Sequence, residues 1–144
     1  EVPLLLGMDG SKMSKSKGNT IELGMDADTT AKLIKRAKTD ADRHISYDPA
    51  ARPEVSNLVL LAALCLGRSP EDVAEELGDA GGGGLKKLVT EAVNERFAPV
   101  RARRAELLAD PGALWEMLHD GNERANDVAD RTLGDVLTAM KMDY

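Results

Sequence analysis

Apolar side chains recur at helical spacing through most of this chain, and that pattern decides what it can fold into. From about residue 28 onward they return at helical spacing in several segments, with a polar connection at residues 39–52 between the first two. Residues 2–6 have the apolar character of the end of a buried strand, and no later segment offers that strand a partner. Because a strand needs a neighbour to satisfy its backbone polar groups, we expect a sheet in a preceding part of a longer protein. The sequence predicts a mainly α-helical fold behind one strand remnant.

Caps and breakers predict where the helices begin and end. A basic amphipathic helix is expected over residues 28–38, and a helix that is apolar on every side over residues 55–66, ending at Gly67. Ser69 is expected to cap a short third helix. Residues 81–84 are four glycines, which we expect to form a connector without regular structure.

The second half of the chain is predicted to hold longer helices, which brings the total to about six. A helix of about 25 residues starts at Leu85 and continues through Pro99, because this proline lies off its apolar stripe. A short helix follows Asp110, and Trp115 is expected to anchor its packing. The Gly-Asn pair at residues 121–122 is expected to separate this helix from the last one.

Composition limits the class of protein. With 144 residues, 42% of them apolar, the chain can bury a core. Its single cysteine, Cys65, cannot form an internal disulfide, which favours a reducing compartment and makes the cytoplasm the expected location. The longest apolar run, residues 58–66, is far shorter than the roughly 20 residues of a membrane span, so no membrane contact is expected. A net charge of −6 excludes a general polyanion binder.

The segment Lys12-Met13-Ser14-Lys15-Ser16 carries the most chemical information. Together with Lys17 it places three ammonium groups and two hydroxyls on a loop between Gly10 and Gly18. Ammonium groups balance phosphate charge, hydroxyls donate hydrogen bonds and glycines act as hinges, so the loop suits a polyphosphate. The loop lacks the residue spacing of a P-loop. Without further context, a solvated basic loop explains the same residues.

The context favours the polyphosphate. The segment resembles the KMSKS signature of class I aminoacyl-tRNA synthetases, which lies between the last strand of a Rossmann-like nucleotide-binding domain and a helical domain. Tyrosyl-tRNA synthetases share this loop, but several later segments are similar to tryptophanyl-tRNA synthetases, and tryptophan is inferred from that resemblance alone. These segments are Lys38-Thr39-Asp40, Tyr47-Asp48-Pro49, Arg52-Pro53, Val55-Ser56-Asn57-Leu58, Ala98-Pro99-Val100-Arg101, Leu107-Leu108-Ala109-Asp110-Pro111 and Gly121-Asn122-Glu123-Arg124-Ala125.

The resemblance implies a tryptophan-tRNA ligase that activates tryptophan with ATP and transfers it to tRNA(Trp) in protein biosynthesis. It implies that Lys12 and Lys15 are catalytic and bind the ATP phosphates, and that Met13, Ser14 and Ser16 complete the ATP-binding loop. Cations at that place stabilise the charge that develops on the departing pyrophosphate. Mg²⁺ is expected to enter as MgATP, without a ligand from this chain. Lys17 lies outside the signature and is expected to be a solvated charge.

Other parts of the active site are expected elsewhere. Neither His44 nor His119 stands in the His-x-Gly-His motif of the family, so this motif and the tryptophan pocket are assigned to the preceding part of the protein. We therefore expect the chain to form no adenylate by itself. The full-length enzyme is expected to be a homodimer through the same preceding part.

Positive charge is concentrated beside the loop. Residues 12–38 carry seven basic and three acidic side chains, a net charge of +4, whereas the rest of the chain sums to −10. Lys32, Lys35 and Arg36, with Lys38 next to them, are candidates for contact with tRNA phosphates, which give affinity without sequence information. The solvated face of an amphipathic helix explains these residues equally well.

Three parts are predicted along the chain. Residues 1–24 end the catalytic domain with the KMSKS loop, residues 25–110 form a helical tRNA anticodon-binding domain, and residues 111–144 form C-terminal helices able to pack back on the catalytic domain. Two alternatives remain open at this stage. One is a tyrosyl-tRNA synthetase fragment, and the other is a helical RNA-binding or interaction module that kept the loop without catalysis.

Overall fold

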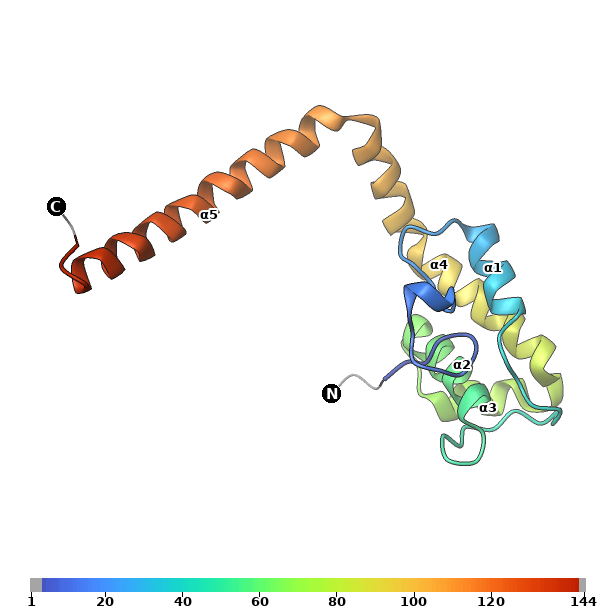
Figure 1. Cartoon of the computed structure of the whole chain (residues 1–144). Helices are drawn as coiled ribbons and strands as arrows, with labels where there is room; N and C mark the ends of the chain where they lie inside the picture. Colours follow the sequence, from blue (N-terminus) through green and yellow to red (C-terminus); the bar gives the residue numbers. More distant parts are fainter. Residues whose placement is uncertain (1–3, 143–144) are drawn as a thin grey trace. The chain divides into compact units, whose positions relative to one another are not determined.

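A computed structural model describes residues 4–142, which form α-helices joined by loops (Figure 1). Over this range there are five α-helices, two short 3₁₀ turns and no strand, so the predicted mainly α-helical fold is confirmed. Part of the expected strand, residues 2–3, lies outside the described range. At its other end Leu6 forms a single antiparallel bridge with Lys12. The chain consists of two compact units, Glu1–Ala102 and Arg103–Tyr144.

The first unit contains helices α1 (Ala27–Lys35), α2 (Pro53–Leu66) and α3 (Pro70–Leu77) and most of α4 (Gly81–Ala109). Local signals in the sequence explain these boundaries. The Asp26 carboxylate accepts a hydrogen bond from a backbone N–H in the first turn of α1. Gly67 ends α2 in the left-handed conformation, with φ of 68°. The Ser69 hydroxyl caps α3 by accepting a hydrogen bond from the Asp72 N–H at 3.1 Å.

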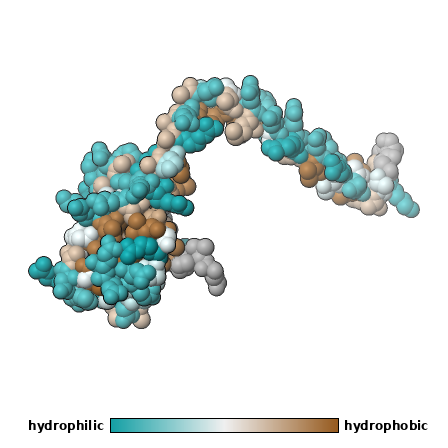
Figure 2. Space-filling model, turned by 180° about the vertical axis from the view of Figure 1, so that it is seen from behind, coloured by the Kyte–Doolittle hydropathy of each residue, from teal (hydrophilic) through white to brown (hydrophobic). Residues whose placement is uncertain are grey.

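Helix α2 is the centre of the core, as its apolar sequence predicted. Half of its residues are buried, and α1, α3 and the first half of α4 contribute the side chains around it. Polar side chains cover most of the surface of this unit, with a smaller apolar area between them (Figure 2). The largest fully buried apolar side chains are Ile34, Ile45, Val55, Leu58, Val59, Val73, Leu85, Val89 and Val93.

The four glycines at residues 81–84 are not a connector; that prediction is wrong. They form the first turn of α4. Their small size allows close packing, because a Cβ atom on Gly84 would lie 2.6 Å from the Cβ of the neighbouring Ala80 and one on Gly82 would lie 3.1 Å from the Thr39 hydroxyl. The Gly81 N–H also donates to the Arg43 carbonyl at 3.0 Å. Glycine therefore serves packing here and not flexibility.

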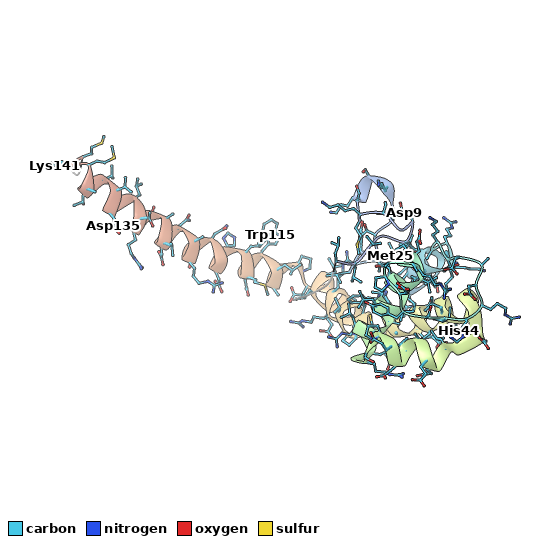
Figure 3. The ribbon with its side chains drawn as sticks, turned by 90° about the horizontal axis from the view of Figure 1, so that it is seen from below. Asp9, Met25, His44, Trp115, Asp135 and Lys141 are labelled. Atoms are coloured by element: carbon cyan, nitrogen blue, oxygen red, sulfur yellow. The ribbon has the colours of Figure 1, made fainter. Side chains whose placement is uncertain are left out.

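Helix α4 continues through Pro99, as predicted, and helix α5 (Pro111–Ala139) is continuous where a break was expected. Gly121 and Asn122 lie inside α5, because a single glycine costs a helix only about 1 kcal/mol and no proline follows to end it. None of the residues of α5 is buried. Trp115, expected to anchor packing, is 64% exposed and stands out from the helix (Figure 3). Within the described range no helix is both long enough and apolar enough to cross a membrane.

Candidate functional site: the KMSKS loop

The KMSKS segment lies in a compact loop with its two ends tied together. The Gly7 N–H donates to the Ser11 carbonyl at 2.7 Å. The Met8 N–H donates to the Asn19 carbonyl at 2.9 Å, which joins the start of the loop to its end. A 3₁₀ turn, Lys15–Lys17, contains the last two residues of the signature and the lysine that follows them. The backbone hydrogen bonds therefore give the loop a defined shape.

The side chain of Asn19 fills the interior of this loop and is only 4% exposed. Its NH₂ group donates to the Asp9 carboxylate at 2.8 Å and to the Lys12 carbonyl at 3.2 Å. Its carbonyl oxygen accepts a hydrogen bond from the Ser14 N–H at 2.9 Å. Asn19 was not among the site residues predicted from the sequence. The signal that could have revealed it is an asparagine directly after the loop's last glycine, since asparagine readily bonds nearby backbone groups.

The predicted phosphate-binding side chains lie on the outside of the loop. Lys12, Lys15 and Ser16 are exposed, and Met13 is 37% exposed. Within residues 4–142 neither Lys12 nor Lys15 forms an ion pair. The hydroxyls of Ser14 and Ser16 lie 2.8 Å apart. The loop thus presents two ammonium groups and a pair of hydroxyls to solvent.

The other charged groups of the loop are held by hydrogen bonds. Lys17, expected to be a solvated charge, is exposed and donates through Nζ to the Ser11 hydroxyl at 3.0 Å. Asp9 lies at the surface of the unit (Figure 3). The hydrogen bonds from the Asn19 side chain and from the Ser11 N–H stabilise the Asp9 carboxylate and lower its pKa from 3.8 to about 2. Asp9 is therefore a fixed negative charge and hydrogen-bond acceptor near neutral pH.

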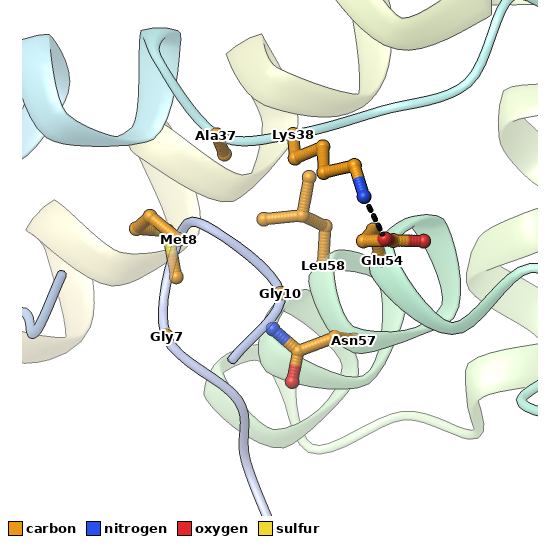
Figure 4. Close-up of a pocket in the computed structure, with 8 residues that line it drawn as sticks. All are labelled: Gly7, Met8, Gly10, Ala37, Lys38, Glu54, Asn57 and Leu58. Carbon is orange, nitrogen blue, oxygen red and sulfur yellow. Dashed lines mark hydrogen bonds and ion pairs between the residues drawn. The ribbon is translucent and has the colours of Figure 1, made fainter. Parts of the chain in front are cut away.

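Two contacts attach the start of the loop to the core, beside the Lys38–Glu54 ion pair that Figure 4 shows. The buried Asn57 of α2 accepts a hydrogen bond from the Leu6 N–H at 2.7 Å and donates to the Leu6 carbonyl at 3.1 Å. The Lys38 N–H donates to the Met8 carbonyl at 2.8 Å. The Lys38 ammonium group forms an ion pair with Glu54 at 2.6 Å. The loop therefore rests on α2 and on the segment that follows α1.

The predicted nucleic-acid residues lie on and directly after α1. Lys32, Lys35 and Arg36 are all exposed. Arg36 borders a hollow of about 210 Å³ that Lys17 and Asn19 of the loop also line. The structure thus brings one member of the basic group next to the KMSKS loop, whereas Lys38 is bound to Glu54.

A second basic surface lies between α1 and α4. A groove of about 390 Å³ is lined by Lys35 from α1 and by Lys86 and Lys87 from α4, with Glu91 as its acidic member. The two α4 lysines were not predicted as site residues, because they lie about 50 residues from Lys35 in the sequence. Only the packing of the two helices places them together.

Other polar residues of the first unit are held in local structure. His44 Nδ1 lies 2.8 Å from the Asp79 carboxylate on the surface. The Asp48 carboxylate accepts hydrogen bonds from the N–H groups of Ala50 and Ala51 at 3.0 Å each, so it shapes a turn. In the part of the chain that the structure describes, no group of three or more His, Cys, Asp or Glu side chains could hold a metal ion.

Comparison with known protein families shows the family to which this chain belongs. Residues 1–98 match the family described as tRNA synthetases class I (W and Y). The chain belongs to this family. This match confirms the resemblance to class I aminoacyl-tRNA synthetases. It covers nearly all of the first unit, which carries the KMSKS loop.

Relatives of this class I synthetase chain include tryptophan enzymes. The tryptophan-tRNA ligase of Nostoc sp. is 39% identical over 130 residues, which are 90% of this chain and 39% of the relative. The chloroplastic/mitochondrial tryptophan-tRNA ligase of Arabidopsis thaliana is 35% identical, over 90% of this chain and 33% of the relative. The crystal structure of tryptophanyl-tRNA synthetase from Campylobacter jejuni, complexed with ADP and tryptophan, is similar with a TM-score of 0.78 at 30% identity.

The lengths of these proteins differ from that of this chain. The Campylobacter jejuni structure is matched over 98% of this chain but over 44% of its own chain. The chain also spans about two fifths of the length of the Nostoc relative.

Proposed function

We propose that this chain is the KMSKS-bearing part of a tryptophan-tRNA ligase. In this proposal the full-length protein activates tryptophan with ATP and transfers it to tRNA(Trp). The observation that carries the proposal is a complete KMSKS segment on an ordered loop, in a chain similar over 90% of its length to a tryptophan-tRNA ligase. The Campylobacter jejuni relative is complexed with ADP and tryptophan, which supports a nucleotide and tryptophan as substrates of this protein as well.

We assign Lys12 and Lys15 to the phosphates of ATP. Both are exposed, and within the described range no carboxylate neutralises either of them. In the activation step the carboxylate of tryptophan attacks the α-phosphorus, the bond to the bridging oxygen breaks, and pyrophosphate departs with the electron pair. Ammonium groups beside the departing pyrophosphate stabilise the transition state more than bound ATP, which raises the rate. The hydroxyls of Ser14 and Ser16 add hydrogen bonds to the same oxygens.

Substitution of Lys15 in the full-length protein tests this assignment. We expect Lys15→Ala to lower kcat for tryptophan-dependent ATP–pyrophosphate exchange by about 100-fold, with a smaller change in KM for ATP, because one charge-stabilising donor contributes on this scale. Lys15→Arg should restore only part of the rate, since a planar guanidinium does not replace a compact ammonium group. Lys141→Ala, the same change in a lysine outside the loop, is the control. An unchanged kcat with a raised KM would contradict a transition-state role.

We further propose that tRNA phosphates contact the basic residues of α1 and the groove between α1 and α4. Lys32, Lys35 and Arg36 are exposed, and the groove adds Lys86 and Lys87 from α4. Several exposed lysines on two adjacent helices suit a phosphate backbone, which binds through charge and releases counterions. The first unit would then bind both the nucleotide and the tRNA.

Salt dependence of tRNA binding tests this second assignment. For the full-length protein we expect Lys35→Ala/Lys86→Ala to weaken tRNA(Trp) binding and to reduce the slope of log K against log salt concentration by about 0.7–0.9 for each phosphate that the protein no longer neutralises. Lys141→Ala removes a positive charge that is not among those lining the groove and should leave the slope unchanged. An unaltered slope in the double variant would contradict the proposal that tRNA binds in this groove.

Further parts of the proposal concern the whole enzyme. Mg²⁺ would enter with ATP, and we assign it no ligand in this chain. We place residues 25–110 in the tRNA anticodon-binding domain and the dimer contacts of a homodimeric enzyme in the part that precedes residue 1. We place the reaction in the cytoplasm, where the single Cys65 would remain a thiol. Aminoacylation assays of the full-length protein with tryptophan and with tyrosine separate the two amino acids that the family serves.

A further inference from the structure

The contacts of Asn19 fall on both sides of the residue that separates Lys12 from Ser14. Its NH₂ group holds the Lys12 carbonyl at 3.2 Å, and its oxygen holds the Ser14 N–H at 2.9 Å. These two backbone groups bracket Met13, so one side chain fixes the path of the backbone through the middle of the signature. The adjoining residues, Lys12 and Lys15, owe the direction of their side chains to that path. Asn19 itself is buried and touches neither ammonium group.

The Asp9 carboxylate determines which way the Asn19 amide faces. An ionised carboxylate only accepts hydrogen bonds, so the NH₂ end of the amide must point to Asp9, at 2.8 Å. The oxygen end is then left to accept the Ser14 N–H. Asp9 is itself fixed, because it accepts hydrogen bonds from the backbone N–H and the hydroxyl of Ser11 at 2.9 and 3.0 Å. Because Asp9 only accepts and the Ser14 N–H only donates, the Asn19 amide has a single orientation that satisfies both.

Gly7 provides the space that Asn19 occupies. A Cβ atom on Gly7 would lie 2.4 Å from Nδ2 of Asn19 and 2.6 Å from its Cγ, closer than nonbonded atoms can approach. Gly7 is not among the glycines with positive φ, so a methyl group there meets this clash without the strain of a left-handed backbone. Gly7→Ala is therefore a steric probe that displaces the Asn19 side chain without changing Asn19.

We propose that Asn19 is a positioning residue for the activation reaction, and that Gly7, Asp9 and Asn19 form a clasp that holds the KMSKS backbone in its working shape. The proposal rests on the proposed function, because its consequence for the rate requires Lys12 and Lys15 at the ATP phosphates. Asn19 is not a catalytic residue, since it acts only through the backbone of the loop. A displacement of about 1 Å at reacting groups can cost about 100-fold in rate, which gives the clasp its importance.

The first experiment measures ATP–pyrophosphate exchange and thermal unfolding of full-length variants. We expect Asn19→Ala and Gly7→Ala each to lower kcat by about 10- to 100-fold, with a smaller change in KM for ATP. Asn94→Ala is the matched control, because this asparagine also bonds a backbone carbonyl, that of Ala27 at 3.3 Å, but lies outside the loop. It should lower the unfolding midpoint and leave kcat unchanged.

A rescue experiment separates positioning from a general structural role. Asn19→Asp places a second carboxylate against Asp9 and should lower kcat at least as much as Asn19→Ala. Adding Asp9→Asn restores a donor and an acceptor between the two positions, with their roles exchanged. We expect kcat of the Asp9→Asn/Asn19→Asp double variant to exceed that of Asn19→Asp by about threefold or more, the range of coupling between residues in direct contact.

Three outcomes would overturn the clasp: a kcat of Asn19→Ala equal to that of the unmodified enzyme, a loss of kcat in Asn94→Ala as large as in Asn19→Ala, or no gain in the double variant. If the proposed function itself is wrong, Lys15→Ala will leave ATP–pyrophosphate exchange unaffected. The clasp is then tested by the rate of amide hydrogen exchange at Ser14 in this chain. Faster exchange in both Asn19→Ala and Gly7→Ala supports the clasp, and unchanged exchange refutes it.

Discussion

Carboxylates near the loop determine which of its neighbouring cations are free to bind a ligand. Lys38 belongs by sequence to the basic group, but its ammonium group lies 2.6 Å from Glu54. The hydrogen bond between them raises the pKa of Lys38 and lowers the pKa of Glu54, so both stay charged over a wide pH range. Lys12 and Lys15 have no such partner within the described residues. Charge counted along the sequence therefore overstates the available charge by one lysine.

Asp9 allows a direct test at the scale of one residue. Its pKa of about 2 is due first to the hydrogen bond from Asn19. Because this pKa lies below the ordinary 3.8, the Asp9 interactions stabilise the folded loop above about pH 4, and that contribution is lost as the pH falls toward 2. We expect Asn19→Ala to raise the pKa of Asp9 toward its ordinary value. NMR titration of the side-chain carboxyl carbon measures this, and equal midpoints in both proteins would contradict it.

At the scale of the helices, Arg101 connects α4 to the beginning of α1. Its guanidinium group donates to the Met25 carbonyl at 2.8 Å, to the Thr30 hydroxyl at 3.1 Å and to Asn94 Oδ1 at 2.9 Å. Thr30 is fully buried and also donates to the Asp26 carbonyl at 2.7 Å. The position of α1, and with it the basic surface beside the loop, therefore depends on one arginine 71 residues away in the sequence.

We expect Arg101→Lys to destabilise the chain by about 2 kcal/mol, because an ammonium group cannot reach three acceptors in the directions of the guanidinium fork. Chemical unfolding followed by circular dichroism gives this difference. Arg104→Lys, at an exposed position of the same helix, is the control and should change the free energy of unfolding by less than about 0.5 kcal/mol. Equal stabilities of the two variants would show that the Arg101 contacts contribute nothing measurable.

Caps and apolar periodicity predicted α1, α2, α3 and the long α4 from the sequence, because these signals act within a few residues. Predictions failed at glycines. The glycines at 81–84 belong to α4, and Thr39, distant in the sequence, packs closely against Gly82. Gly121 lies inside α5, because one glycine does not suffice to end a helix. In the site, the signature itself was visible in the sequence. The groove lysines Lys86 and Lys87 were not, since only the packing of α1 and α4 brings them to Lys35.

At the scale of the whole molecule, the two units differ in what holds them together. Every buried apolar side chain in the described range lies between Met8 and Val93, inside the first unit. Apolar and polar side chains alternate along the exposed surface of α5 (Figure 2). Its large exposed apolar side chains are Trp115, Met117, Leu118, Val128, Leu133 and Val136. The hydrophobic effect therefore stabilises the first unit, whereas a helix without buried residues is marginal in water.

A truncation tests this difference. We expect residues 1–102 alone to unfold cooperatively, with a midpoint within about 5 °C of the whole chain, since a loss of 1 kcal/mol shifts a domain of this size by about 4–8 °C. Circular dichroism at 222 nm should show that the helical signal of residues 103–144 disappears gradually in the whole chain, outside the main transition. A chain that ends at residue 88 is the control, because it lacks the buried Val89 and Val93 and should not fold. Loss of the cooperative transition on removing residues 103–144 would mean that the second unit supplies part of the core.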